Sequence, residues 1–342
     1  MKAFQVSRRG LLASTLAMTT VLAGGAAFAE GKITIGLALP FQGNGWQAGV
    51  VASANWAVAE AKKSGKDVEL VVVDAAGDPQ AQIQQVNNLV LQGVSAILLE
   101  PLSDTALNGA IDNAADAGIP VITFGTGSVT NAKAIDLNFD FKELGKMYVG
   151  YIAERTGGKG NALNVRGLAG NQAEQAIQDA LLAALKDYPD IKIVSEVYGD
   201  WNQSTAQQKI AGVLPTLPKI DIVFSQGVAA FGAAQAFMAA GKDVPLQVYG
   251  FDGVDLKMLI GLNAKSGYES VAINTDPGAA GAAVNVALAK LSGVDVPMKM
   301  IAPIPKITLD QIKKDYANMP DGETIWVKYD YDYTLKNIIG AK

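Results

Sequence analysis

The chain has 342 residues and carries 28 Lys and Arg against 33 Asp and Glu, a net charge of −5, with no cysteine and no histidine. This composition excludes disulfides, thiolate nucleophiles, imidazole bases and Cys or His metal ligands. An acidic chain is also poorly suited to bind the phosphate backbone of nucleic acid. We therefore expect no cofactor, no metal site and no nucleic-acid partner.

The first 29 residues are predicted to be an export signal. Lys2, Arg8 and Arg9 form a basic head, an apolar stretch follows, and residues 27–29 (Ala-Phe-Ala) provide a small-residue cleavage site. The apolar stretch is shorter and more polar than the roughly 20 apolar residues that a membrane span needs. The paired arginines resemble a twin-arginine signal, but ordinary secretory signals also contain such pairs, so both routes stay open.

Cleavage after Ala29 leaves 313 residues with a net charge of −8, enough for two domains. No cysteine is available to carry a lipid anchor. The expected product is a free protein of the periplasm, and its acidic surface favours a monomer.

From Ile33 onward, short apolar runs alternate with longer segments of helical period. Nearly continuous apolar strands joined by helices predict α/β lobes with parallel sheets covered on both faces. In the first series we expect strands at 33–39, 68–73, 96–99 and 120–123, and helices at 46–63, 79–92 and 104–117. In the second we expect helices at 141–155, 172–186, 202–214, 229–240 and 277–291, and strands at 161–165, 192–197, 221–225, 246–249 and 268–273.

Ligands of open parallel sheets bind outside the carboxyl ends of the strands, so residues just after each strand are candidate contacts. The loop after the first strand contains Asn44, Trp46 and Gln47. Aromatic rings pack on the C–H faces of sugars, and amides both donate to and accept from hydroxyls. Trp201 and its neighbouring amides repeat this combination. The alternative is that Trp46 is core and Asn44 a helix cap.

Other strand ends allow two interpretations. The loop at 124–127, which contains Thr126, either cradles a ligand or only turns the chain. Arg166, before a glycine-rich turn that ends at Gln172, could meet an oxygen-rich or anionic group. Asp252 could accept two hydroxyl donors or cap the next helix. By contrast, Asp78 and Glu100, each before a proline, are predicted to be loop and helix-start residues.

Several segments together carry a family resemblance. The run Gly-Ile-Pro-Val-Ile-Thr at 118–123, the turn at 250–253, the loop at 167–170 and the segment Asp276-Pro277 resemble periplasmic sugar-binding proteins of the ribose and galactose type. The similarity covers nearly all of residues 31–307. It implies a type I periplasmic binding protein fold, in which two Rossmann-like lobes joined by a three-crossing hinge close on one ligand and present it to an ABC permease.

The same resemblance implies ligand-binding roles for individual residues. Asn44, Trp46 and Gln47 match first-loop contacts, Trp201 an aromatic that stacks on the sugar, Asp252 a carboxylate that receives hydroxyls, and Asn274 an amide at the hinge. Thr126, Arg166, Gln172 and Gln226 complete the predicted contacts.

The departures from the family pattern point to a particular kind of ligand. Gly125-Thr126 stands in place of an Asp-Arg pair, Ile177 in place of a helix arginine, and Gly227-Val228 in place of an Asn-Asp pair. Because a buried hydroxyl without a partner costs roughly 1–3 kcal/mol, a smaller, acyclic or less oxygen-rich ligand fits better than an ordinary pyranose. Pentose, deoxy sugar, polyol and sugar acid stay open, the last only if Arg166 faces the cleft.

The predicted lobes comprise residues 30–138 plus 275–303 and residues 139–274 plus 304–342. The tail beyond Ile307 exceeds the usual family length and has no assigned role. The main hypothesis is a solute-binding protein of an ABC transporter that is not an enzyme. The alternatives are a ligand-sensing partner of a membrane receptor and a carbohydrate-active enzyme with paired carboxylates. A DNA-binding repressor would need a helix-turn-helix and a basic surface.

Overall fold

The computed structural model describes residues 31–125 and 127–341. The predicted export signal and the candidate residue Thr126 lie outside the described residues. The strands are β1 (Ile33–Leu39), β2 (Val68–Asp74), β3 (Ala96–Leu99), β4 (Val121–Phe124), β5 (Ile135–Phe139), β6 (Lys159–Arg166), β7 (Asp190–Tyr198), β8 (Ile222–Ser225), β9 (Leu246–Gln247), β10 (Val271–Ile273), β11 (Lys299–Ala302) and β12 (Lys306–Thr308). The helices are α1 (Gly45–Lys63), α2 (Pro79–Leu91), α3 (Asn108–Asp116), α4 (Phe141–Thr156), α5 (Gln172–Leu185), α6 (Gln203–Val213), α7 (Ala229–Ala239), α8 (Gly253–Ser266), α9 (Ala279–Leu291), α10 (Leu309–Gln311) and α11 (Tyr331–Tyr333). None of these described helices combines the length and the hydropathy needed to cross a membrane.

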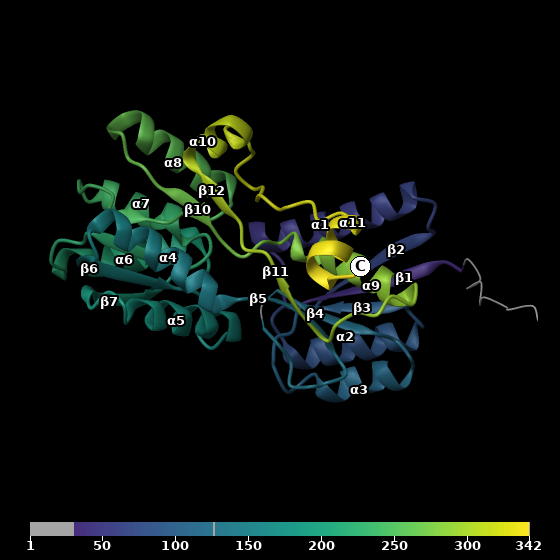
Figure 1. Ribbon diagram of the computed structural model, residues 1–342. Coiled ribbons are helices and arrows are strands. Elements are labelled where there is room, and N and C mark those ends of the chain that lie inside the picture. Colours follow the sequence, from purple (N-terminus) through teal and green to yellow (C-terminus); the bar gives the residue numbers. More distant parts are fainter. Residues whose placement is uncertain (1–30, 126, 342) are drawn as a thin grey trace, which may run out of the picture. The chain divides into compact units, whose positions relative to one another are not determined.

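The first sheet has the strand order β11-β5-β4-β3-β1-β2, and all neighbouring strands run parallel. Its central strands β3 and β4 are buried at every residue, as expected for a sheet covered on both faces. Helices α2 and α3 pack on one face through Leu89 and Ile111, and α1 and α9 pack on the other through Val50 and Val284 (Figure 1).

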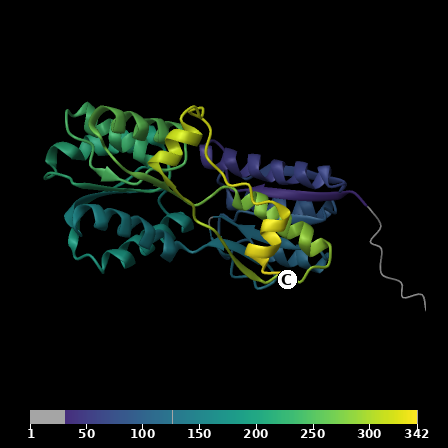
Figure 2. The same ribbon diagram turned by 45° about the horizontal axis from the view of Figure 1, so that its top comes forward.

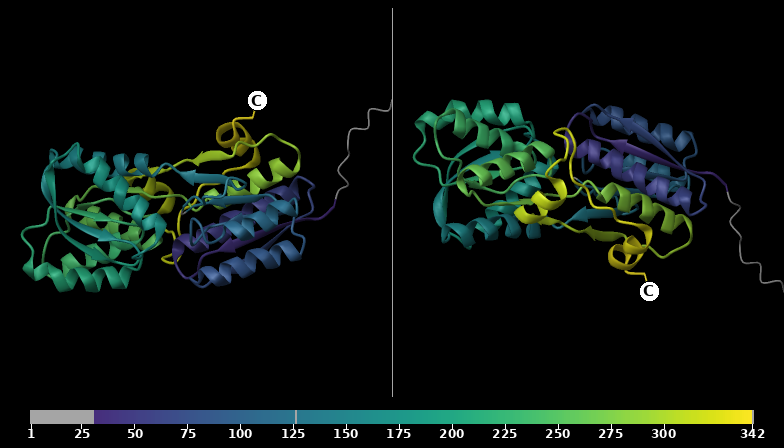
Figure 3. Two further views of the ribbon diagram at one scale, coloured as in Figure 1. Left: turned by 90° about the horizontal axis from the view of Figure 1, so that it is seen from below. Right: turned by 90° about the horizontal axis from the view of Figure 1, so that it is seen from above.

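The second sheet has the order β7-β6-β8-β9 and is also parallel. Helices α4 and α5 contribute Ile152 and Leu181 to the core on one face, and α6 and α7 contribute Ile210 and Phe237 on the other (Figure 3). Two sheets, each between layers of helices, confirm the predicted α/β class with two lobes.

The chain passes between the two sheets at three places that the strand order defines. It leaves the first sheet after β5, returns between β10 and α9, and leaves again between β11 and the short antiparallel pair that β12 forms with β10. The ends of some strands in each sheet therefore lie close to the segments that connect the two sheets.

The C-terminal tail adds a fourth passage, because it begins on the second lobe and ends on the first. Its first helical segment, 309–316, packs on α8 through Ile312. Its last helical segment, 331–339, packs on α9 and β11, where Ile338 and Ile339 are buried in the core of the first lobe (Figures 1 and 2).

This packing differs from the prediction that all of 304–342 belongs to the second lobe. Helix α9 is buried along residues 279–289, so its apolar surface needs cover on more sides than α1 and the sheet provide. The end of the tail supplies that cover.

Asp276 connects the start of α9 to this tail. Its carboxylate is fully buried and accepts hydrogen bonds from the backbone N–H of Gly278, at 2.8 Å, and of Val327, at 3.1 Å. Burial raises the pKa of Asp276 to about 6. The folded protein therefore holds a proton on this carboxyl between about pH 4 and pH 6, where the unfolded chain releases it.

We expect the free energy of unfolding contributed by Asp276 to be present below about pH 4 and to be lost as the pH rises through about 6. The difference in unfolding free energy between the wild type and Asp276→Asn should thus fall by on the order of 1–3 kcal/mol over this range. Urea unfolding at pH 4–7 measures it, with Asp187→Asn, at an exposed position, as the control. A difference that is constant with pH would contradict the prediction.

Candidate functional site

A pocket lies where strand ends of both sheets meet the connecting segments. It encloses about 710 Å³, counted with the open solvent at its mouth. Five of the predicted ligand residues line it: Asn44, Trp46, Gln47, Trp201 and Asn274. These side chains follow the carboxyl ends of β1 and β7, one strand from each parallel sheet, and of β10, which pairs antiparallel with β12.

The loop after β1 forms one wall through residues that also begin α1. The Asn44 side chain caps this helix by accepting from the Gln47 backbone N–H at 2.8 Å. The Gln47 amide Nε2 donates to both carboxylate oxygens of Glu100, at 3.0 Å each, and both side chains are buried. Asn44 therefore caps α1, as the alternative interpretation of the sequence proposed, and it also lines the pocket.

Trp46 lies against the end of β4. Its indole N–H donates to the backbone carbonyl of Thr275 at 3.2 Å, which fixes the ring relative to the segment after β10. A Cβ atom on Gly125, which has φ of +87°, would lie 3.1 Å from the ring atom Cη2. The absence of a side chain at Gly125 thus lets the ring approach the backbone.

Trp201 forms the facing wall from the second lobe. Asp200 and Trp201 both have positive φ, 56° and 50°, which is uncommon for residues other than glycine and clusters at functional sites. The ring lies against Gly167, where a Cβ would overlap it, and against Gly227, where a Cβ would lie 3.0 Å from Cδ1. Two glycines and a strained turn therefore position this indole at the pocket.

Asn274 links the pocket to the passage between β10 and α9. Its side-chain oxygen accepts from the Thr275 backbone N–H at 2.9 Å, and Thr275 lines the pocket as well. The family resemblance assigned an amide at the hinge to this position.

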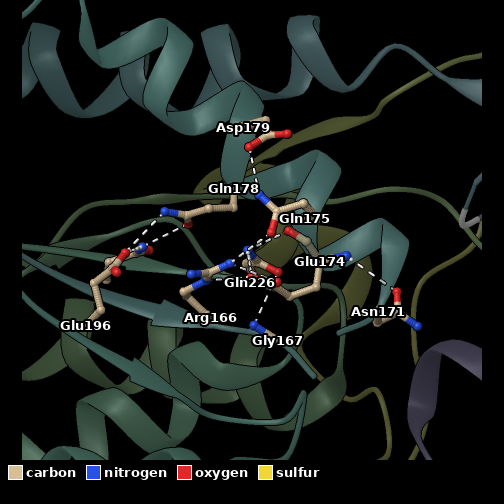
Figure 4. Close-up of polar contacts among 10 residues, drawn as sticks. Arg166, Gly167, Asn171, Glu174, Gln175, Gln178, Asp179, Glu196 and Gln226 are labelled. Atoms are coloured by element: carbon tan, nitrogen blue, oxygen red, sulfur yellow. Dashed lines mark hydrogen bonds and ion pairs between the residues drawn. The ribbon is translucent and has the colours of Figure 1, made fainter. Parts of the chain in front are cut away.

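Arg166 is bound within the second lobe. Its Nε and Nη2 donate to the two carboxylate oxygens of Glu174 at 2.7 and 3.0 Å (Figure 4). Its guanidinium lies 4.8 Å from the centre of the Tyr198 ring. The Glu174 side chain is 2% exposed. Arg166 is not among the residues that line the pocket, because Glu174 holds it beneath the start of α5.

Gln226 belongs to the same polar cluster. Its oxygen accepts from the Gly167 backbone N–H at 3.2 Å, and its amide donates to Glu174 (Figure 4). It lines a smaller chamber next to the pocket. Gln172 lies beside Gly127, where a Cβ would be 2.7 Å from its side-chain oxygen, and does not line the pocket.

Asp252 lies outside the lining of the pocket. Its carboxylate packs against Gly45 at the start of α1, where a Cβ would overlap an oxygen, and its backbone pairs with Thr324 of the tail. Burial raises the pKa of Asp252 to about 6. The tail and α1 thus cover the carboxylate that the resemblance assigned to ligand hydroxyls.

Several lining residues were not among the predicted contacts. Glu100 follows β3 and was interpreted as a helix-start residue, although the strand-end rule that selected Trp46 applies to it equally. Phe41, in the loop after β1, could also have been found in this way. Asn171, Phe141 and Val228 lie at helix starts, and no local pattern distinguishes them from caps or core residues.

Comparison with known proteins identifies relatives of this fold. A family model described as a periplasmic binding protein domain matches residues 35–294. A xylitol-binding protein of Mycolicibacterium smegmatis is 30% identical over 252 residues, which are 72% of this chain and 70% of that protein. The ribose import binding protein RbsB of Escherichia coli is 27% identical over 243 residues, 71% of this chain and 80% of that protein.

A solved structure extends the similarity to nearly the whole chain. The ABC transporter solute binding protein from Thermobispora bispora is 30% identical, with a TM-score of 0.80 over 91% of this chain and 95% of that one. The two parallel-sheet lobes, the matched family model and these relatives lead to one conclusion: the chain belongs to the periplasmic binding protein family.

Proposed function

We propose that this protein captures a neutral sugar or polyol in the pocket and delivers it to an ABC permease, after export by the general secretory or the twin-arginine route. The observation that carries the proposal is the pocket wall, in which the indoles of Trp46 and Trp201 accompany the amides of Asn44, Gln47 and Asn274. Rings cover C–H faces, and amides can donate to and accept from hydroxyls. Relatives named for xylitol and ribose support this ligand class.

The charges at the pocket favour a neutral ligand over a sugar acid. Among the described residues that line it, Glu100 is the only ionisable side chain. The candidate cation, Arg166, is held by Glu174 and Tyr198 away from the lining. A carboxylate ligand would therefore lie in a pocket whose described lining contributes no positively charged side chain, which disfavours binding.

Capture follows from walls that come from both lobes. Trp46 and Trp201 belong to different lobes, so one ligand that contacts both rings is bound more tightly when the two walls are brought together. A ligand can shift a conformational equilibrium only through such a difference in affinity. The conformation with the ligand enclosed is the one proposed to be offered to the permease.

The side chains that line the pocket favour binding of a sugar without its hydrolysis. Hydrolysis of a glycoside uses a pair of carboxyl groups at opposite sides of the bond. The described lining of the pocket contains one carboxyl group, that of Glu100. The Asp252 carboxyl group is covered by α1 and the tail. A bound sugar is therefore expected to be released unchanged.

The test is a thermal-shift screen of the protein against matched pairs of a neutral sugar or polyol and the corresponding sugar acid. A ligand that binds only the folded state stabilises it by about 2.7 kcal/mol at 100 times its dissociation constant. We expect the melting temperature to rise with members of the neutral series and to stay unchanged with the acids.

Chromatography of the ligand after incubation with the protein tests whether the ligand is released unchanged. We expect to recover the intact ligand. Larger shifts with the acids, or conversion of the ligand to a product, would contradict the proposal. No shift with any sugar or polyol would remove the assignment of the ligand class.

A further inference from the structure

The ligand pocket continues into an inner chamber of the second lobe. Ile177, Gly227 and Asn274 line both spaces, so the two adjoin. The chamber is the smaller of the two spaces, with about 400 Å³ of space outside protein atoms against about 710 Å³ for the outer pocket, open solvent included, so it admits only a small group. It lies between the second sheet and the helices α4 and α5, which supply much of its wall.

Apolar side chains form much of this wall. Leu144 of α4, Ile177 and Leu181 of α5 and Phe224 of β8 line the chamber. Leu144, Leu181 and Phe224 are at most 5% exposed. A carbon group of a ligand would find close contacts with these side chains, and water would be displaced from apolar surface.

Apart from Asn274, which stands at the boundary with the outer pocket, the polar side chains of the chamber have their donors engaged elsewhere. The Tyr148 hydroxyl donates to the Ile273 carbonyl at 2.8 Å, and the Gln226 amide donates to Glu174. The Asn164 amide donates to Gln178 at 2.9 Å and to Glu196 at 2.7 Å (Figure 4).

Deep in the chamber, the hydrogen-bonding capacity that remains is that of an acceptor. The Ser225 hydroxyl is directed at the Val248 carbonyl. In the described part of the chain the side-chain oxygen of Asn164 is a buried acceptor without a partner. A ligand hydroxyl in the chamber could donate to this oxygen, but away from Asn274 at the boundary its own oxygen would meet only side-chain donors that are already engaged, which is unfavourable in a buried site.

We propose that the ligand directs a carbon end without a hydroxyl group, a methyl group above all, into this chamber. The preferred ligand is then a deoxy sugar or a deoxy polyol, whose hydroxyls face the amides and indoles of the outer pocket. This inference rests on the proposed function, because it concerns the orientation and the class of the same ligand.

Calorimetric titration with matched ligands tests the proposal. The pairs are galactose with 6-deoxygalactose, mannose with 6-deoxymannose, and ribose with 5-deoxyribose, which differ by one terminal hydroxyl. For the pair that binds, we expect the deoxy member to bind at least about tenfold more tightly, a difference of 1.4 kcal/mol.

Two variants of nearly equal volume identify the chamber as the cause. Ile177→Thr adds a hydroxyl, which both donates and accepts, whereas Ile177→Val keeps the wall apolar. The preference for the deoxy sugar is the dissociation constant of the hydroxylated member divided by that of the deoxy member. This ratio should be at least about threefold smaller in Ile177→Thr than in Ile177→Val. Thermal unfolding of both variants without ligand corrects for any loss of folded protein.

The outcomes separate the two proposals. Tighter binding of the hydroxylated member, or equal preference in the two variants, would overturn this inference and leave the proposed function standing. Failure of all these sugars and of polyols to bind would overturn the proposed function together with the inference.

Discussion

Replacement of Glu174 by alanine is expected to lower the free energy of unfolding by about 3–5 kcal/mol. The Glu174 carboxylate accepts two hydrogen bonds from Arg166 and one from Gln226, and the side chain is 2% exposed. The Arg166 side chain is 14% exposed, so removal of the carboxylate leaves a largely buried guanidinium without its anion. The loss of a single partner is costly because the remaining charge stays desolvated. Chemical denaturation with urea measures the change.

The chain offers a matched pair as a control. Arg155 and Glu269 also form an ion pair, at 3.0 Å, but their side chains are 37% and 62% exposed. Glu269→Ala should therefore cost at most about 1 kcal/mol. Equal losses for the two alanine variants would show that burial does not determine the strength of the Arg166–Glu174 pair. The double variant Arg166→Met with Glu174→Leu is expected to recover much of the lost stability, since it removes both charges.

Replacement of Trp201 by alanine should weaken binding of the sugar or polyol by at least about 2 kcal/mol, roughly 30-fold. Its ring is held between the pocket and two glycines, Gly167 and Gly227, so the side chain is already ordered before the ligand arrives. A ring that needs no further ordering contributes its contact area to binding with little loss of entropy. Calorimetric titration of wild type and variant with the ligand found by the screen measures the effect.

Trp326→Ala serves as the control for this prediction. Trp326 packs on Trp56, with 5.9 Å between ring centres, and does not line the pocket. Its loss should change stability but leave the dissociation constant within about threefold of wild type. If the two tryptophan variants bind the ligand equally well, Trp201 is not part of the ligand site.

Much of the candidate site could be predicted because strand ends are visible in the sequence. Asn44, Trp46 and Gln47 follow an apolar strand, and parallel strands bring their carboxyl ends to one edge. Trp201 was found in the same way, whereas Asn274 was predicted from the family resemblance; both are far from the first loop in sequence. The strand rule also places Glu100 correctly, but its neighbour Pro101 favoured the interpretation as a helix start.

The direction of a side chain after a strand was harder to predict. Arg166 is the last residue of β6, close to a strand end as Asn44 is, yet its guanidinium pairs with Glu174 rather than facing the pocket. Asp252 lies in a loop where a ligand contact was expected, yet Gly45 and Thr324, which are distant in sequence, cover its side chain. Both outcomes depend on partners that tertiary packing brings near, and no local pattern indicates them.

The fold shows the same division. The apolar strands of the first lobe and their helices were predicted, whereas β5 and β11 were not. Polar residues interrupt both strands, Asp136 and Asn138 in β5 and Lys299 in β11, so neither forms a continuous apolar run in the sequence. The last part of the tail was assigned to the second lobe, and the structure packs it on α9 of the first.

The sequence by itself determined the α/β class, the alternation of strands and helices, the absence of cysteine and histidine chemistry, and the amide and indole residues at the strand ends. These properties follow from local composition and periodicity, which every segment carries with it. Only the tertiary structure decided that Glu174 holds Arg166, that the tail covers Asp252 and α9, and that an inner chamber adjoins the pocket. Each of these depends on which distant surfaces meet, because burial and hydrogen bonding are properties of contacts and not of single segments.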